Sequence, residues 1–159
     1  MEDIQAVQSI MTRDVVSVGP DTPLQEAAEV LARHGFDGMP VVDGENKLVG
    51  ILTEYDLISK GSAIHLPTFQ KVIQNLGVYS KDKSRLVKDF KELAALTVKD
   101  VMNNDPLTLS EDATYEDAVS AFRDHHRVNP IPVVDQNRKV VGVVSRFDVL
   151  KPLHLVDKK

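Results

Sequence analysis

Two short segments of this chain combine residue types that can cap a helix or hold a nucleoside. They read Thr53-Glu54-Tyr55-Asp56 and Ser145-Arg146-Phe147-Asp148, and each follows a glycine and two apolar residues. A hydroxyl residue three positions before a carboxylate is typical of a capping box, in which both side chains satisfy amides that the first helical turn leaves unpaired. On this interpretation neither segment binds a ligand.

The same residues also suit a nucleoside ligand. A helix N-terminus offers free amides and the positive end of a dipole, which favour a phosphate. A short, rigid aspartate can accept hydrogen bonds from two adjacent ribose hydroxyls, so Asp56 and Asp148 are candidate ribose-binding residues. Thr53 and Ser145 would then face the phosphate. The residues alone support both interpretations equally.

Both segments belong to a longer internal repeat. The run Pro40-Val41-Val42-Asp43 returns as Pro132-Val133-Val134-Asp135, and residues 47–56 return as residues 139–148. Neither copy alone covers both faces of so small a sheet, so the copies are expected to pack together as pseudo-symmetric halves.

Each copy is predicted to form a strand, a helix, a hairpin and a second helix. In the first copy, residues 15–18 are the expected first strand, a β-branched run that ends at a Gly-Pro pair. Thr22 is the expected N-cap of the next helix, with Pro23 in the first helical position and Gln25 completing a capping box. The i, i+3, i+4, i+7 spacing predicts a buried face made of Leu24, Ala27, Ala28 and Leu31.

The hairpin lies at the centre of each copy. In the first copy the expected strands are residues 39–42 and 47–52, and a helix begins at Thr53. The second copy repeats this order between residues 107 and 150, with its turn at residues 135–138. The predicted fold class is therefore mixed, α/β (α+β).

Residues 61–96 separate the two copies and match neither. Residues 67–76 can be helical, and residues 84–95 more convincingly so, with Leu86, Phe90 and Leu93 along one stripe. We expect a helical insertion that serves packing or a subunit contact.

Composition excludes several classes of protein. The chain has 159 residues, 42% hydrophobic and 27% charged, as expected of a compact domain with a real core. Its formal charge of -5, without a long basic run, argues against a nucleic-acid surface. No apolar run approaches the roughly 20 residues of a membrane span, and the start does not resemble a signal peptide, so a cytoplasmic protein without membrane contact is expected.

Catalytic and metal-binding patterns are missing from the sequence. It contains no cysteine, no His-Glu-x-x-His, no phosphate loop and no Gly-x-Gly-x-x-Gly. The adjacent His125 and His126 do not suit a metal, because neighbouring helical residues do not face one another. With Arg127 they are expected to complement a helix dipole. We therefore expect neither an enzyme nor a metal protein.

The duplicated motifs resemble the CBS domain, named after cystathionine β-synthase, and two in tandem resemble a Bateman module. The resemblance rests on the lead-in Val98-Lys99-Asp100-Val101-Met102, the Pro-Val-Val-Asp strand and the Gly-x-x-[Ser/Thr]-x-x-Asp ending. It covers residues 7–60 and 97–151, leaves 61–96 as the insertion, and indicates a stand-alone CBS domain-containing protein. It implies two βαββα units packed through their sheets with pseudo-twofold symmetry, and a homodimer of such pairs.

The resemblance also implies a regulatory module that senses adenosyl ligands, such as AMP, ADP, ATP or S-adenosylmethionine, with no required cofactor. Each cleft would combine the Ser/Thr-x-x-Asp motif of one copy with the first strand of the other copy and with the loop before its second strand. Carried over by position, one cleft joins Thr53 and Asp56 to Thr108, Val128, Asn129, Pro130 and Ile131, and the other joins Ser145, Arg146 and Asp148 to Ser17, Asp37, Gly38 and Met39.

The two clefts are not expected to be equivalent. Some relatives carry Arg or His where this chain has Asp37 and Asn129, which weakens the case for polyphosphates. Glu54 in one motif would repel an anion, whereas Arg146 in the other would attract one. We therefore predict that the cleft of Asp148 binds an adenosyl monophosphate more tightly.

A structural interaction protein is the alternative. In that case both motifs are only caps, and the insertion helices contact a partner such as an effector protein. Ser17 and Thr108 are then ordinary strand residues, and Gly38 and Pro130 only form turns.

Overall fold

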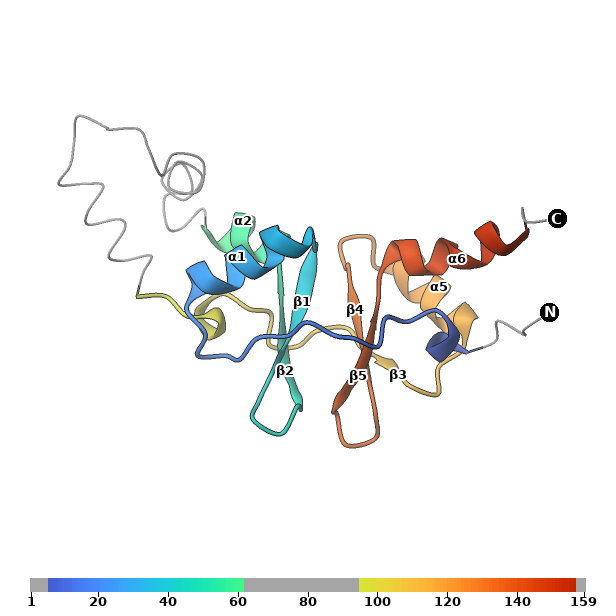
Figure 1. The fold of residues 1–159 in the computed structure, drawn as a ribbon, viewed down its shortest axis with the longest axis horizontal. Coiled ribbons are helices and arrows are strands. Elements are labelled where there is room, and N and C mark those ends of the chain that lie inside the picture. Colours follow the sequence, from blue (N-terminus) through green and yellow to red (C-terminus); the bar gives the residue numbers. More distant parts are fainter. Residues whose placement is uncertain (1–5, 62–94, 157–159) are drawn as a thin grey trace, which may run out of the picture.

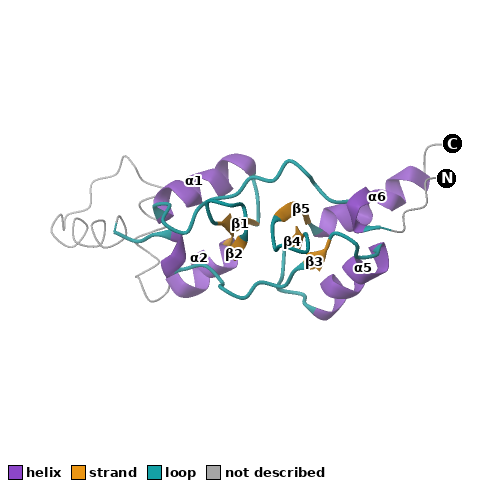
Figure 2. Cartoon of the chain, turned by 90° about the horizontal axis from the view of Figure 1, so that it is seen from below, coloured by secondary structure: helices purple, strands orange, loops and turns teal. Residues whose placement is uncertain are grey.

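The computed structural model describes residues 6–61 and 95–156. Two similar units lie side by side, with their strands facing each other in the middle and their helices outside (Figure 1). The perpendicular view shows the same layering (Figure 2). The mixed fold class and the packing of two units through their sheets are therefore confirmed. The helices predicted over residues 67–76 and 84–95 fall almost wholly outside the described ranges and stay predictions.

The first unit is a hairpin between two helices. Helix α1 (Leu24–His34) ends at Gly35, whose φ of 64° forms a left-handed cap. Strands β1 (Gly38–Val42) and β2 (Leu48–Thr53) pair antiparallel, and α2 (Glu54–Gly61) follows directly. The predicted buried face of α1 is confirmed, because Leu24, Ala27, Ala28 and Leu31 are all buried.

The second unit shows the complete predicted order. Strand β3 (Leu109–Ser110) pairs parallel with β4 (Ile131–Val134), which pairs antiparallel with β5 (Val140–Val144). Helix α5 (Tyr115–Asp124) connects β3 to β4, and α6 (Arg146–Val156) follows β5. Among the helices of both described ranges, none is long and apolar enough to cross a bilayer.

The strand predicted over residues 15–18 is wrong as a regular strand. Val18 forms a single parallel bridge to Val41, with Val42 N donating to Val18 O at 2.9 Å. Val15 packs instead against the apolar cluster that joins the two hairpins. The segment therefore diverges from β1 before a second bridge can form.

The predicted cap of α1 is also wrong. Pro23, with a ψ of 133°, is itself the N-cap, so the helix begins one residue later than expected. Thr22 Oγ1 accepts a hydrogen bond from Gly19 N (3.2 Å) in the preceding turn, and Gln25 completes no capping box. An extended proline has moved Thr22 out of reach of the helix amides.

The segment that leads into each unit packs in the core of the other unit. The short 3-10 helix η1 (Val7–Ser9) contributes Val7 to the core of the second unit, followed by Ile10 and Met11. The matching 3-10 helix η3 (Val98–Asp100) contributes Val98 to the core of the first unit. This exchange ties the two units into one structure.

The repeated glycines allow the exchanged segments to cross the hairpins closely. A Cβ atom at Gly50 would lie 2.8 Å from the backbone oxygen of Asn103 and 2.8 Å from Met102 Sδ. A Cβ atom at Gly142 would lie 2.5 Å from Met11 Sδ. Any larger residue at either position would therefore clash with the crossing segment.

Candidate functional site

The first turns of α2 and α6 carry the same hydrogen-bonded cap. Asp56 Oδ2 accepts hydrogen bonds from Thr53 N (3.1 Å) and Thr53 Oγ1 (2.8 Å), and Asp56 N donates to Thr53 Oγ1 (3.2 Å). Ser145 and Asp148 make the equivalent bonds at 2.7, 2.9 and 3.3 Å. The structure therefore shows the capping role of both motifs directly.

Both capping carboxylates are buried, which is costly for a charge that lacks partners. Within the described ranges, the buried charged residues are Asp56 and Asp148, at 9% and 6% exposure. Asp148 has a second partner, because its Oδ1 lies 2.5 Å from Lys151 Nζ. The same Lys151 amine donates to Ile10 O (2.7 Å), so Asp148 is linked to the exchanged N-terminal segment.

Asp37 and Asn129 connect the two helix N-termini. Glu54 N donates to Asp37 O (2.9 Å), and Arg146 N donates to Asn129 Oδ1 (3.1 Å). Asn129 Nδ2 in turn donates to Asp37 Oδ2 (2.5 Å), which forms a bridge between the units. A phosphate at either helix N-terminus would have to compete with these bonds, so the amides are less free than the sequence indicated.

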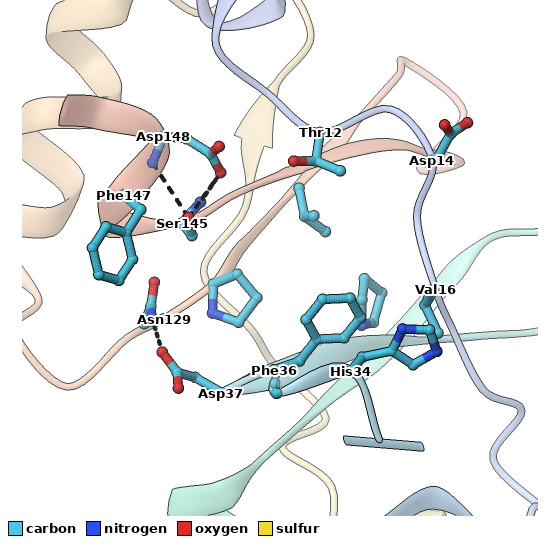
Figure 3. Close-up of a pocket in the computed structure, with 15 residues that line it drawn as sticks. Thr12, Asp14, Val16, His34, Phe36, Asp37, Asn129, Ser145, Phe147 and Asp148 are labelled. Atoms are coloured by element: carbon cyan, nitrogen blue, oxygen red, sulfur yellow. Dashed lines mark hydrogen bonds between the residues drawn. The ribbon is translucent and has the colours of Figure 1, made fainter. Parts of the chain in front are cut away.

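Two pockets share this bridge, and we name each after its capping residue. The Ser145 pocket has a volume of about 350 Å³ and takes its walls from both units (Figure 3). The Thr53 pocket has a volume of about 240 Å³. Asp37 and Asn129 line both pockets. The two cavities are therefore composite, as expected, but unequal in size.

The Ser145 pocket has an aromatic wall. The rings of His34 and Phe36 stack with their centroids 4.9 Å apart and their planes at 11°. They lie across the pocket from Ser145 and Asp148 (Figure 3). Flat aromatic and apolar surfaces of this kind suit a planar base, while a carboxylate on the far side suits hydroxyl groups.

The arginine side chains of this region line the Thr53 pocket. Arg127 lies over the Tyr55 ring, 6.0 Å from its centroid. Arg146 lines this pocket and not the Ser145 pocket, because its Nη2 donates to His126 O on the Thr53 side. The positive charge that we expected beside Ser145 is therefore directed to the other cavity.

The structure brings together some of the predicted site residues and separates others. The Ser145 pocket contains Asp37, Gly38, Asn129, Pro130, Ser145 and Asp148, and the Thr53 pocket contains Asp37, Thr53, Asn129 and Arg146. Neither is lined by Ser17, Met39, Asp56, Thr108, Val128 or Ile131. The side chains of Met39 and Ile131, at 1% and 0% exposure, belong to the two cores.

Sequence reasoning missed several lining residues. Thr12 and Asp14 enter the Ser145 pocket on the exchanged N-terminal segment, for which the repeat alone contains no signal. Tyr55 and Phe147 occupy the same position in the two motifs and are 50% and 80% exposed. An aromatic residue beside the aspartate in both copies was a signal that the sequence did offer.

Comparisons with known proteins agree with this architecture. The chain is 30% identical over 154 residues to an inosine-5'-monophosphate dehydrogenase of Methanocaldococcus jannaschii, covering 95% of this chain and 25% of that protein. It is 30% identical over 155 residues to the chloroplastic CBS domain-containing protein CBSX1 of Arabidopsis thaliana, covering 93% of this chain and 64% of that protein. The solved structure of CBSX2 in complex with AMP matches with a TM-score of 0.70 and 25% identity, covering 96% of this chain and 98% of that one.

Two similar units, each with a hairpin between two helices, exchange their lead-ins and enclose composite pockets, which defines a tandem-domain architecture. The sequence model of the CBS domain matches residues 7–62 and 98–155, so the chain belongs to the CBS domain family and carries a pair of these domains. It spans only 25% and 64% of the two curated relatives, and the dehydrogenase match is confined to that part of the enzyme.

Proposed function

We propose that this chain is a regulatory module that binds an adenosyl ligand between its two CBS domains. The observation that carries the proposal is the Ser145 pocket, which reaches the size range of small-molecule sites, roughly 300–1,000 Å³, and is lined by both units. The likeness to CBSX2, which is solved with AMP, supports the ligand class. No catalytic role is proposed.

In the Ser145 pocket, Asp148 would accept ribose hydroxyls through Oδ1, while Oδ2 keeps the helix cap. Lys151, which holds Oδ1 and is half exposed, would yield this oxygen to the ligand. The stacked rings of His34 and Phe36 would flank the base. The Thr53 pocket falls below the usual size range, so the Ser145 pocket is proposed as the tighter site for an adenosyl ligand because of its size.

Isothermal titration calorimetry with AMP, ADP, ATP, S-adenosylmethionine and 5′-methylthioadenosine tests this proposal. Saturable binding to the wild-type protein is expected, and Asp148→Asn should weaken it more than Asp56→Asn does. The two variants are matched, because each alters the same cap. Loss of binding in Asp56→Asn alone would show that the ligand binds at the Thr53 motif instead.

Regulation requires that the ligand prefers one arrangement of the two units. A homodimer and a separate effector protein are part of the proposal. Helix α6 exposes Phe147, Leu150 and Leu153 at 80%, 44% and 62%, which supports self-association through this helix. Light scattering with and without ligand measures the oligomeric state, and a monomer under both conditions would remove the dimer from the proposal.

An interaction module without a ligand is the second candidate. The specific observation in its favour is that Asp56 and Asp148 both accept the cap hydrogen bonds of their own helices, so each motif has a structural role of its own. A ligand that binds the folded state must raise its stability, so thermal unfolding separates the candidates. An unchanged Tm with every adenosyl ligand would favour the interaction module.

A further inference from the structure

We propose that the Ser145 pocket selects adenosine nucleosides whose 5′ substituent is uncharged or cationic, such as a thioether or a sulfonium, over nucleoside phosphates. This inference rests on the proposed adenosyl binding and adds the charge of the ligand that the pocket accepts. It follows from the charges on the pocket walls, which differ from the charges that the motif alone indicated.

Three carboxylates line the Ser145 pocket, namely those of Asp14, Asp37 and Asp148. Neither Lys nor Arg occurs among its described lining residues, and His34 is the only titratable base there. Lys151 offsets the charge of Asp148. Asp14 and Asp37 have no salt bridge within the described parts of the chain, so neither carboxylate is directly paired with a cation.

The N-terminus of α6 does not restore an attraction for anions. Asp148 already occupies the place that an anion would take, since its Oδ2 accepts from Ser145 N and Ser145 Oγ. The next amide, Arg146 N, donates to Asn129 Oδ1. The positive end of the helix dipole is therefore paired with a carboxylate of the protein itself.

The cations that would stabilise a phosphate line the other cavity. Arg127 and Arg146 line the Thr53 pocket, and Asp37 belongs to the wall that the two cavities share. A 5′ phosphate in the Ser145 pocket would therefore meet carboxylates that have no directly paired cation, and the repulsion acts at short range in a partly desolvated site. A thioether avoids this penalty, and a sulfonium is attracted.

Calorimetry on the full chain tests the selectivity with 5′-methylthioadenosine, S-adenosylmethionine and AMP. We expect the first two ligands to bind at least about tenfold more tightly than AMP. Raising the ionic strength from about 0.05 to about 0.5 M should strengthen AMP binding and weaken S-adenosylmethionine binding, because salt screens both interactions.

Charge-removing variants identify the cause. Asp14→Asn and Asp37→Asn should each reduce the preference for 5′-methylthioadenosine over AMP several-fold. Asn at position 37 still accepts the hydrogen bond that Asn129 Nδ2 donates, so the bridge is retained. The matched control is Asp112→Asn, which removes the same charge from an exposed position outside the pocket and should leave the preference unchanged.

The outcomes separate this inference from the function on which it rests. AMP binding as tightly as 5′-methylthioadenosine, or a preference that neither pocket variant changes, would overturn the charge selection and leave the adenosyl site standing. No binding of any adenosyl ligand would overturn both.

Discussion

The N-termini of α2 and α6 have the same cap and different surroundings. In each, an aspartate accepts two hydrogen bonds from the Ser or Thr three residues before it, at distances between 2.7 and 3.1 Å. Carboxylates and the His34–Phe36 stack lie around α6, whereas Arg127 and Arg146 lie around α2. Each pocket takes part of its wall from the opposite unit, so one repeated motif stands in two electrostatic environments.

The largest effect on stability, and a clear difference between the units, is expected from substitutions where the exchanged segments cross the hairpins. Replacing Gly50 or Gly142 by Ala should lower the free energy of unfolding by about 1–3 kcal/mol, because each new methyl group clashes. Gly50→Ala should cost more, since it meets the backbone oxygen of Asn103 at 2.8 Å, whereas Gly142→Ala meets first the flexible side chain of Met11. Urea unfolding measures both values.

The control for this comparison is Gly44→Ala, in the turn of the first hairpin. A Cβ atom there has no atom within 4 Å, so stability should change little. A larger loss in Gly142→Ala than in Gly50→Ala would show that the backbone can shift at the first crossing.

An intermediate loss of stability is expected when either capping carboxylate is removed. Asp56→Ala should cost about 1 kcal/mol, the usual contribution of a helix cap. Asp148→Ala should cost more, because Asp148 also pairs with Lys151 at 2.5 Å. When Lys151 is replaced by Met, Asp148→Ala should lower the free energy of unfolding by no more than Asp56→Ala does. A larger loss that persists without Lys151 would show that the salt bridge is not its cause.

The smallest effect on stability is expected from the side-chain cap of α5, which α1 lacks and which should be lost at acid pH. Hydrogen bonds from the Thr114 side chain and backbone lower the pKa of Asp117 below 3.8, whereas α1 has no side-chain cap. Since the folded-state pKa is lowered, the stabilisation is present above the unfolded-state pKa and is lost as the pH falls through the folded-state value. Asp117→Asn should therefore be less stable than the wild type at about pH 6, and the difference should close as the pH falls through the lowered folded-state pKa of Asp117.

Urea unfolding as a function of pH measures this effect. The control is Asp112→Asn, two residues before Thr114, whose carboxylate has no hydrogen bond within the described ranges. A gap for Asp117→Asn that stays constant with pH would contradict the titration.

Local patterns predicted the elements well, because they depend on neighbours in sequence. The apolar spacing of α1 and both Ser/Thr-x-x-Asp caps are of this kind. The failures at residues 15–18 and at Thr22 have a common cause. Val15 packs against apolar residues in the interface between the hairpins, and the extended Pro23 moves Thr22 away from the amides of α1. Neither outcome follows from local propensity.

The candidate site could be predicted only in part, for a related reason. The resemblance to the CBS domain, carried over by position, was enough to place Asp37, Ser145 and Asp148 in one pocket, and it assigned Asn129 to the Thr53 side although this residue lines both pockets. It could not show that Arg146 lines the opposite cavity, or that Asp14 joins the Ser145 pocket on an exchanged segment. Side-chain direction and segment exchange depend on packing between the units.

The sequence by itself determined the duplicated unit, its hairpins and its two caps, because these interactions span a few residues, such as the three between Ser145 and Asp148. Only the tertiary structure decided which charges face each pocket. The bond that joins the two pockets, from Asn129 to Asp37, spans 92 residues. Its partners meet only because the cores of both units, with their exchanged lead-ins, bring them together.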